Sequence, residues 1–162
     1  FKCRHHVQPT NEVIMAKYYS TKTFGNDRGL SCAFRQWRAD SHCNQVHGYS
    51  LGFHFVFEAE ELDHRNWVYD FGDTKWIKEY LEEAFDHTTA VAMDDPEIDL
   101  FKQMDEMGVL TLRVFSDVGC ERFAEIVYTD IAPEVSNRTN NRVRLKSVEV
   151  FEHGSNSAIF EG

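Results

Sequence analysis

Residues 47–57 read His-Gly-Tyr-Ser-Leu-Gly-Phe-His-Phe-Val-Phe, an alternation of bulky side chains with smaller or polar ones. A period of two places every second side chain on the same face of a β-strand. The face with the bulky residues would comprise His47, Tyr49, Leu51, Phe53, Phe55 and Phe57. Because so apolar a face must be covered, this segment predicts a central strand packed under helices.

Two later segments repeat with the period of an α-helix. The second is expected to end at Pro133, because proline cannot continue the hydrogen bonding of a helix. Between them, residues 93–96 predict a turn and residues 100–107 a short extra helix. The apolar stripes of the two main helices are Trp76, Ile77, Tyr80, Leu81 and Ala84, and Cys120, Phe123, Ala124, Val127 and Ile131.

Further strands are expected on both sides of these helices. Residues 18–38 predict a strand that is interrupted near Gly25–Gly29. Residues 143–152 alternate with a slip of one residue, which predicts a β-bulge near Lys146-Ser147. After Gly154, a last short strand is expected around residues 158–160. The resulting order, ββααββ, predicts an α+β fold in which two helices cover one face of an antiparallel sheet.

The bulk composition is that of one globular domain. The chain has 162 residues, 42% of them hydrophobic and 13 of them Phe, enough for one buried core. The domain is expected to span residues 15–162, because Met15 resembles a natural start. Residues 1–14 are interpreted as a leader or tag that need not be ordered.

Charge and cysteine usage restrict the partners and the compartment. The formal net charge of −10 comes without a basic stripe, which argues against binding nucleic acid. No apolar run approaches the ~18 residues of a membrane span. The four cysteines form no CxxC motif and have no framework spacing, so reduced thiols in a cytoplasmic protein are the simplest interpretation.

Two local features place nucleophilic or basic groups together. Cys43 precedes His47 at the start of the predicted central strand, and a nearby base or metal would hold the thiol partly as a reactive thiolate. Asp86-His87 follows the first helix, and a carboxylate beside an imidazole orients it and raises its basicity. Each has a plainer structural explanation: a small buried cysteine with a hydrogen-bonded histidine, and a histidine at a helix C-terminus.

Two acidic residues are candidates for binding a ligand. Glu121 opens the second helix, where an acid is also common for electrostatic reasons alone. Glu152 continues the inward face of a strand after two apolar residues, which is unusual for a carboxylate. A ligand with a guanidine-like edge would supply two donors to it. The alternative is a strand end that reaches solvent.

In this order the features resemble the 6-pyruvoyl-tetrahydropterin synthase / 6-carboxytetrahydropterin synthase family. The 6-carboxytetrahydropterin synthases of this family serve the queuosine pathway. The matching elements are Cys43-x3-His47-Gly48, the segment Val68-Tyr69-Asp70-Phe71, Asp86-His87, Glu121 and Glu152. The resemblance covers residues 18–160. It implies a tunnelling fold (T-fold), whose subunits join into a barrel and whose rings stack, giving a homohexamer.

The resemblance also implies a substrate and a role for each matching residue. The family acts on 7,8-dihydroneopterin triphosphate as a lyase. Cys43 corresponds to the catalytic thiol, and Asp86 and His87 to its proton relay. Glu152 corresponds to the carboxylate that binds the amino-pyrimidine edge of the pterin, with Glu121 near the same site. Charge alone suggests Arg35 and Arg38 as phosphate contacts.

The family's zinc site is incomplete in this chain. Family members bind zinc through three histidines, one on the first strand and two in a His-Gly-His motif. Here the first-strand position is Phe34 and the last position of the motif is Tyr49, so that only His47 remains. Catalytic zinc normally needs three protein ligands. His42, Cys32 and Tyr49 are the candidates to complete the site, and the sequence leaves zinc binding open.

Two other functions therefore remain as alternatives to the pterin lyase. One is a metal-independent aldolase or tautomerase that acts on dihydroneopterin through Cys43 and His87. The other is a non-catalytic T-fold module that binds a pterin or a purine through Glu152.

Overall fold

The computed structural model describes residues 16–162, so the expected leader of residues 1–14 lies outside the described part. In this part the chain forms seven strands and three α-helices. Their bounds are β1 Tyr18–Phe24, β2 Leu30–Phe34, β3 His47–Ala59, α1 Lys75–Phe85, β4 Thr88–Ala92, α2 Ile98–Glu106, β5 Leu112–Phe115, α3 Cys120–Arg138, β6 Val143–His153 and β7 Asn156–Glu161.

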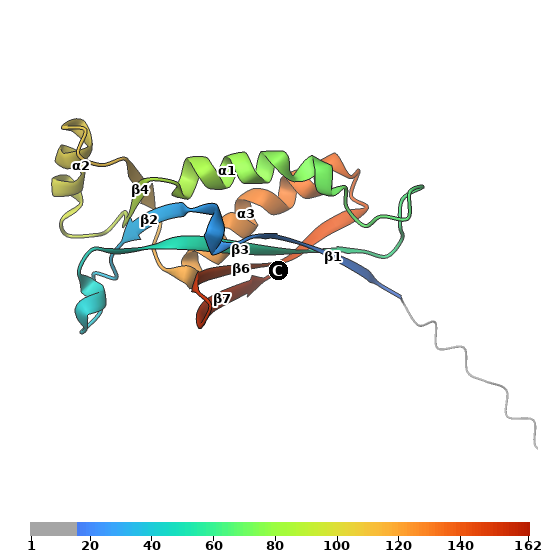
Figure 1. Cartoon of the computed structure of the whole chain (residues 1–162), viewed down its shortest axis with the longest axis horizontal. Helices are drawn as coiled ribbons and strands as arrows, with labels where there is room; N and C mark the ends of the chain where they lie inside the picture. The colour runs from blue at the N-terminus through green and yellow to red at the C-terminus, as the bar shows by residue number, and fades with distance from the viewer. Residues whose placement is uncertain (1–15) are drawn as a thin grey trace, which may run out of the picture.

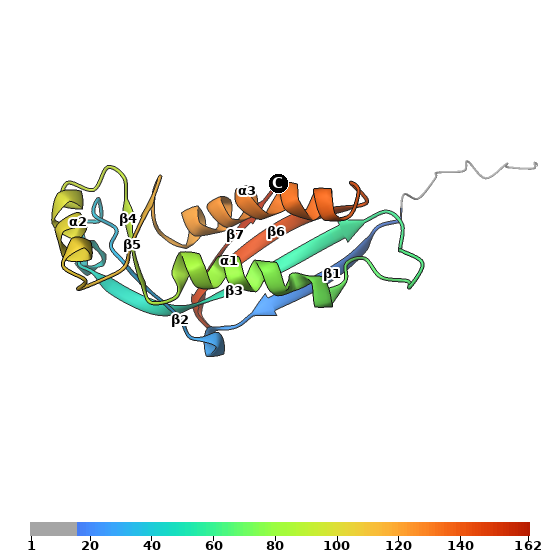
Figure 2. The same cartoon turned by 90° about the horizontal axis from the view of Figure 1, so that it is seen from above.

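All strands belong to one sheet in the order β5-β4-β2-β3-β6-β7, and β1 pairs with the same edge of β3 as β2 does. β1 and β2 therefore act as one long strand interrupted at Gly25–Gly29, as the sequence predicted. Helices α1 and α3 lie side by side over one face of the sheet, and α2, β4 and β5 extend one end of it (Figures 1 and 2). This confirms the α+β class with two helices on one face.

The core lies between these two helices and the apolar face of β3. The side chains of Leu51, Phe53, Phe55 and Phe57 are fully buried, as their alternation predicted. From the helices, Ile77, Leu81, Phe123 and Val127 meet them with 1% exposure or less. Burying so many large side chains is the main source of stability for a domain of this size.

The expected antiparallel sheet is in fact mixed. β4 pairs in parallel with β2, and β5 pairs in parallel with β4. The sequence did not reveal β4 because all five of its residues are buried, which removes the alternation that identifies a half-exposed strand. β5 is only four residues long and none of them is fully buried, so it shows no clear alternation either. The inserted helix α2 and the turn at Met93-Asp94 that precedes it are where the sequence predicted them.

The expected end of the second helix at Pro133 is wrong, because α3 continues through this proline to Arg138. The pyrrolidine ring lies on the exposed side of the helix. Two residues later, Val135 is fully buried in the core. We attribute the continuation to this burial, which offsets the single backbone hydrogen bond that proline cannot make.

The predicted β-bulge in β6 is confirmed. Val56 is paired with Ser147 while the next residue, Phe57, is paired with Leu145, so Lys146 is the extra residue. The slip returns Val148 and Val150 to the buried face of the sheet. It also places Glu152, two residues further on, at the end of that same face.

A buried carboxylate on the helix-free face of β3 predicts how stability depends on pH. Glu58 is 4% exposed and accepts hydrogen bonds from Arg144 Nε at 2.6 Å and Lys17 Nζ at 3.0 Å. The hydrogen bond from Arg144 is the main reason that its pKa falls to about 2. A depressed folded-state pKa stabilises the protein above the unfolded-state pKa, and this stabilisation is lost as the pH falls towards the folded-state value.

We therefore expect the free energy of unfolding to fall by on the order of 2–3 kcal/mol between pH 4.5 and pH 2 through Glu58 alone. Urea unfolding of the wild type and the Glu58→Gln variant over this pH range measures it. In the Glu58→Gln variant, the free energy of unfolding should fall less between pH 4.5 and pH 2, by the amount given for Glu58. Glu60→Gln, at an exposed neighbouring position, should show the same fall as the wild type. Equal slopes for Glu58→Gln and the wild type would contradict the assignment.

Candidate functional site

The start of β3 and the end of β2 bring three rings together. His47 is paired across the strands with Phe34, and Tyr49 follows two residues later on the same face. Ring centroids are 5.1 Å apart for Phe34 and His47, and 5.7 Å apart for His47 and Tyr49. Gly48 allows this close approach, since a Cβ there would lie 2.9 Å from the carbonyl oxygen of Cys32.

Cys43 lies in a single 3₁₀ turn, His42–Asn44, directly before β3. Ser41 caps the turn, with its hydroxyl accepting from the Cys43 backbone N–H at 3.3 Å. The carbonyl oxygen of Cys43 accepts from the Gln36 N–H at 2.9 Å, which ties the turn to the segment after β2. The thiol is half-buried, so it is held in place and remains accessible to a ligand.

The start of α3, with Cys120 and Glu121, and the end of β6, with Glu152, contribute further ionisable side chains to this region. Tyr49 has a raised pKa because of burial first and then of the negative charges of Glu152, Cys43 and Cys120. Burial, followed by Glu152 and Glu121, raises the pKa of Cys120 to about 12. Each of these groups is therefore within electrostatic range of its neighbours. Cys43 and Glu152 are thus both close enough to Tyr49 to affect its pKa, and Tyr49 in turn contacts the ring of His47. Glu121 is exposed at the start of α3 and influences only Cys120.

Asp86 and His87 form the expected carboxylate–imidazole pair. The Nδ1 atom of His87 is 2.7 Å from Oδ1 of Asp86. Adjacent residues in a helix do not face each other, but α1 ends at Phe85 and His87 has a φ of 54°. This left-handed conformation is uncommon for a residue with a Cβ, and it turns the ring back onto the carboxylate. The imidazole is 84% exposed.

Within one chain this pair lies away from Cys43. Oδ1 of Asp86 is 3.5 Å from the backbone nitrogen of Ser31, whereas Cys43 is bound to the backbone of Gln36. Five residues of extended chain between Ser31 and Gln36 correspond to roughly 16 Å. Cys43 and Glu152 therefore both lie near Tyr49, whereas Asp86 and His87 lie at the start of β2.

The proposed phosphate contacts are already engaged within the chain. The guanidinium of Arg35 donates two hydrogen bonds to Asp95, at 2.6 and 2.8 Å, and Asp95 is 2% exposed. Arg38 pairs with Asp94 and stacks on Trp37, with 4.1 Å between its Cζ and the ring centroid. Arg38 is the more exposed of the two arginines and so the better placed to meet an anion.

Two residues of this region were not predicted from the sequence. Cys120 is buried beside Glu152, and the His153 ring lies 6.1 Å from that of Tyr49. Both directly adjoin predicted residues, Glu121 and Glu152. The strand and helix periods alone could not assign them, because their proximity to Tyr49 depends on how β6 and α3 pack.

The remaining candidate zinc ligands do not form a metal centre with His47. Cys32 is 1% exposed, and burial raises the pKa of its thiol. His42 is exposed to solvent in the 3₁₀ turn. Across residues 16–162, no three His, Cys, Asp or Glu side chains come close enough to hold a metal ion. The described residues therefore do not fit the zinc that the resemblance implies.

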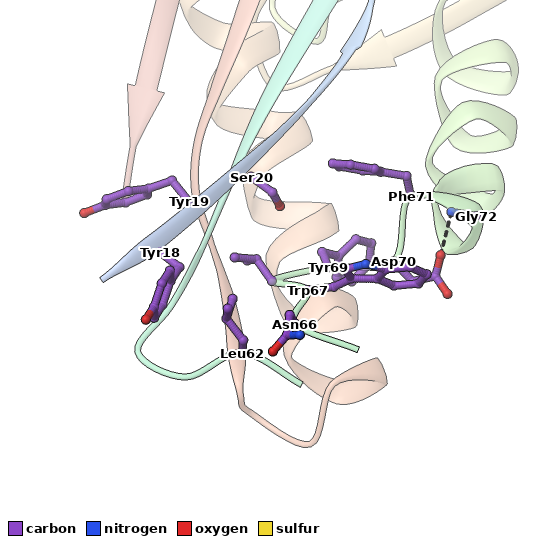
Figure 3. A pocket seen from close by; sticks show the side chains of 11 residues that line it. Tyr18, Tyr19, Ser20, Leu62, Asn66, Trp67, Tyr69, Asp70, Phe71 and Gly72 are labelled. Atoms are coloured by element: carbon purple, nitrogen blue, oxygen red, sulfur yellow. Dashed lines mark hydrogen bonds between the residues drawn. The ribbon is translucent and has the colours of Figure 1, made fainter. Parts of the chain in front are cut away.

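A separate half-open cavity of about 570 Å³ lies at the other end of the sheet, where β1 begins (Figure 3). Its walls include Tyr18, Trp67, Tyr69 and Phe71, and none of the predicted catalytic, substrate-binding or metal residues lines it. Residues 68–71, which match the family pattern, line this cavity, and Asp70 caps the next turn by accepting from the Gly72 N–H at 2.8 Å.

None of the helices in residues 16–162 is both long and apolar enough to cross a membrane.

Comparisons with solved structures agree with the fold. An uncharacterized protein from Wolinella succinogenes is 18% identical, with a TM-score of 0.78, and the match covers 91% of this chain and 99% of that chain. A catalytic-residue mutant of Plasmodium vivax 6-pyruvoyltetrahydropterin synthase is 14% identical, with a TM-score of 0.61 and coverage of 91% and 98%. The Caenorhabditis elegans 6-pyruvoyl tetrahydropterin synthase is 18% identical, with a TM-score of 0.57 and coverage of 91% and 95%.

These likenesses show a shared fold, the T-fold that the resemblance implied. No curated protein sequence matches the chain. A family model described as 6-pyruvoyl tetrahydropterin synthase, however, matches residues 25–162, which include every predicted site residue. The chain therefore belongs to the 6-pyruvoyl tetrahydropterin synthase family.

Proposed function

We propose that this protein is a pterin-type carbon–oxygen lyase that acts on 7,8-dihydroneopterin triphosphate, in the manner of 6-carboxytetrahydropterin or 6-pyruvoyl-tetrahydropterin synthases. The observation that carries the proposal is that a half-buried thiol, Cys43, and a half-buried carboxylate, Glu152, both lie close to Tyr49, whose ring is 6.1 Å from that of His153, the residue after Glu152. Glu152 would accept two hydrogen bonds from the amino-pyrimidine edge, and Cys43 would move protons on the side chain at C6.

The position of Asp86 and His87 favours a site shared between copies of the chain. The pair is exposed and lies roughly 16 Å along β2 from the Cys43 turn. A relay that acts with Cys43 would therefore come from a neighbouring copy. The outer edge of β1, which pairs only with β3, is one surface on which copies could join. We accordingly propose a homo-oligomer, with a homohexamer as the form that the family implies.

The test is turnover by the purified full-length chain. With 7,8-dihydroneopterin triphosphate we expect release of triphosphate, measured as phosphate after pyrophosphatase treatment. Acetaldehyde released in equal amount would indicate the 6-carboxytetrahydropterin product of the queuosine pathway, and its absence the 6-pyruvoyl product. No release of triphosphate, with zinc, with other metals or without metal, would contradict the proposal.

One observation favours a second candidate function. Because Arg35 is bound to the buried Asp95 and Arg38 to Asp94, few cations near Cys43 are free to meet a triphosphate. A metal-independent aldolase or tautomerase acting on unphosphorylated dihydroneopterin would not need them. Parallel assays with and without the triphosphate group separate the two reactions. Binding without turnover of either compound would indicate the non-catalytic pterin- or purine-binding module.

A further inference from the structure

The residue at the first zinc-ligand position of the family is built into the core of this protein. Phe34 is 1% exposed, and its ring packs edge-on against Phe123 of α3, with 5.3 Å between centroids. The same ring contacts His47 and Tyr49. An apolar ring thus occupies the space beside His47 in which a second ligand would have to lie, and removing it would open a cavity under α3.

His47 offers one ring nitrogen to a ligand. Its Nδ1 lies 2.8 Å from the carbonyl oxygen of Gln45. Because a carbonyl can only accept, Nδ1 carries the proton and Nε2 is left as an acceptor. This arrangement would suit a zinc ligand, but a catalytic zinc needs two further protein ligands. Tyr49 is the ring next to it, and a phenol with an ordinary pKa of about 10 is a poor ligand at neutral pH.

The other candidates are held in different interactions. Cys32 is paired across the strands with Tyr49, but its sulfur accepts from the Thr88 hydroxyl at 3.6 Å and lies 3.7 Å from the Ala33 carbonyl oxygen. Both contacts point to a thiol satisfied in the interior. The exposed His42 lies on the solvent side of the 3₁₀ turn. Of the four predicted ligands, His47 alone remains free to bind a metal, and across residues 16–162 no three His, Cys, Asp or Glu side chains form a metal site.

We infer that this chain does not hold the family's zinc, and that the hydroxyl of Tyr49 and Nε2 of His47 together form a hydrogen-bonding pair for a hydroxyl of the ligand. The two rings meet edge to face, with 5.7 Å between centroids. A phenol donates and Nε2 accepts, so a ligand hydroxyl, which does both, complements the pair. Tyr49 is in this sense a positioning residue. The hydrogen-bonding role of Tyr49 and His47 rests on the proposed function, whereas the absence of the family's zinc does not.

Metal content tests the first part without reference to activity. The full chain is expressed in zinc-supplemented medium, freed of loose metal by gel filtration, and measured by elemental analysis. We expect about 0.1 zinc per chain or less for the wild type, because one histidine is too few ligands. Retention of about one zinc per chain by the wild type would overturn the inference.

A gain-of-ligand variant provides the matched control. Phe34→His combined with Tyr49→His restores three histidines on one surface, and about one Co²⁺ per chain should bind with the visible absorption of a tetrahedral site. Adding His47→Ala to this variant should abolish the absorption. If the double variant does not fold, Tyr49→His alone should still fail to bind Co²⁺. Wild-type binding equal to that of the double variant would contradict the inference.

Kinetics test the role of Tyr49. Tyr49→Phe removes one neutral hydrogen bond, so we expect KM for the pterin substrate to rise about 3–10-fold with the thermal unfolding temperature nearly unchanged. An unchanged KM in an active enzyme would overturn the positioning role. If the wild type turns over no pterin, the proposed function fails, while the metal measurement remains valid in either case.

Discussion

The Cys43→Ala variant should turn over the pterin substrate about 10²–10⁴-fold more slowly than the wild type, the range over which a positioned acid–base group contributes to catalysis. The thiol is half-buried, and Cys43 takes part in the hydrogen bonds of its turn only through its backbone N–H and C=O, so removal of the thiol should leave the fold intact. Steady-state kinetics measure the loss, and the thermal unfolding temperature serves as the control for folding.

The conservative variant Cys43→Ser separates acidity from shape. A hydroxyl occupies nearly the same space but does not ionise near neutral pH, so this variant should be nearly as slow as Cys43→Ala. Activity close to that of the wild type in either variant would rule out Cys43 as the proton-transfer group.

Mixing two inactive variants tests whether the thiol and the relay come from different copies. Cys43→Ala and His87→Ala chains carrying different tags are co-expressed, and oligomers with both tags are purified. If each site takes Cys43 from one copy and His87 from another, random assembly leaves about a quarter of the sites with both groups. Mixed oligomers as inactive as the separate variants would instead require both groups from the same chain, which the positions of Ser31 and Gln36 disfavour.

The second large effect is expected at Glu152. Glu152→Gln should weaken pterin binding by at least about 100-fold, because hydrogen bonds to a charged group contribute about 1.5–3 kcal/mol each and a carboxylate can accept two from the amino-pyrimidine edge. The amide keeps the size of the side chain but replaces one acceptor with a donor. Fluorescence titration with a dihydropterin, in the absence of turnover, measures the dissociation constant.

Glu149→Gln is the matched control for this variant. Glu149 lies three residues earlier in β6, where it accepts a hydrogen bond from the Ser157 hydroxyl at 2.6 Å, and it is paired with His54 on the opposite face of the sheet. Its replacement should leave the dissociation constant unchanged. If Glu152→Gln binds as tightly as Glu149→Gln, then the pterin does not bind through Glu152, and the substrate assignment loses its main support.

Local patterns in the sequence were sufficient for most of the secondary structure. The period of two in residues 47–57 predicted the buried face of β3, and the slip after Leu145 predicted the bulge at Lys146. Such patterns are reliable because each element has one buried side, and burial selects the residue type position by position. They failed where that contrast disappears: β4 is buried throughout, and the core contact of Val135 carries α3 past Pro133.

The sequence also determined which chemical groups the site contains, including the replacement of two zinc-binding histidines by Phe34 and Tyr49. It could not determine how these groups are arranged, because their distances depend on strand register and helix packing between segments far apart in the chain. Only the tertiary structure places Cys120 and His153 beside Glu152 and Tyr49, and separates Asp86-His87 from Cys43. It also makes Phe34 a core residue, since α3 lays Phe123 against that ring.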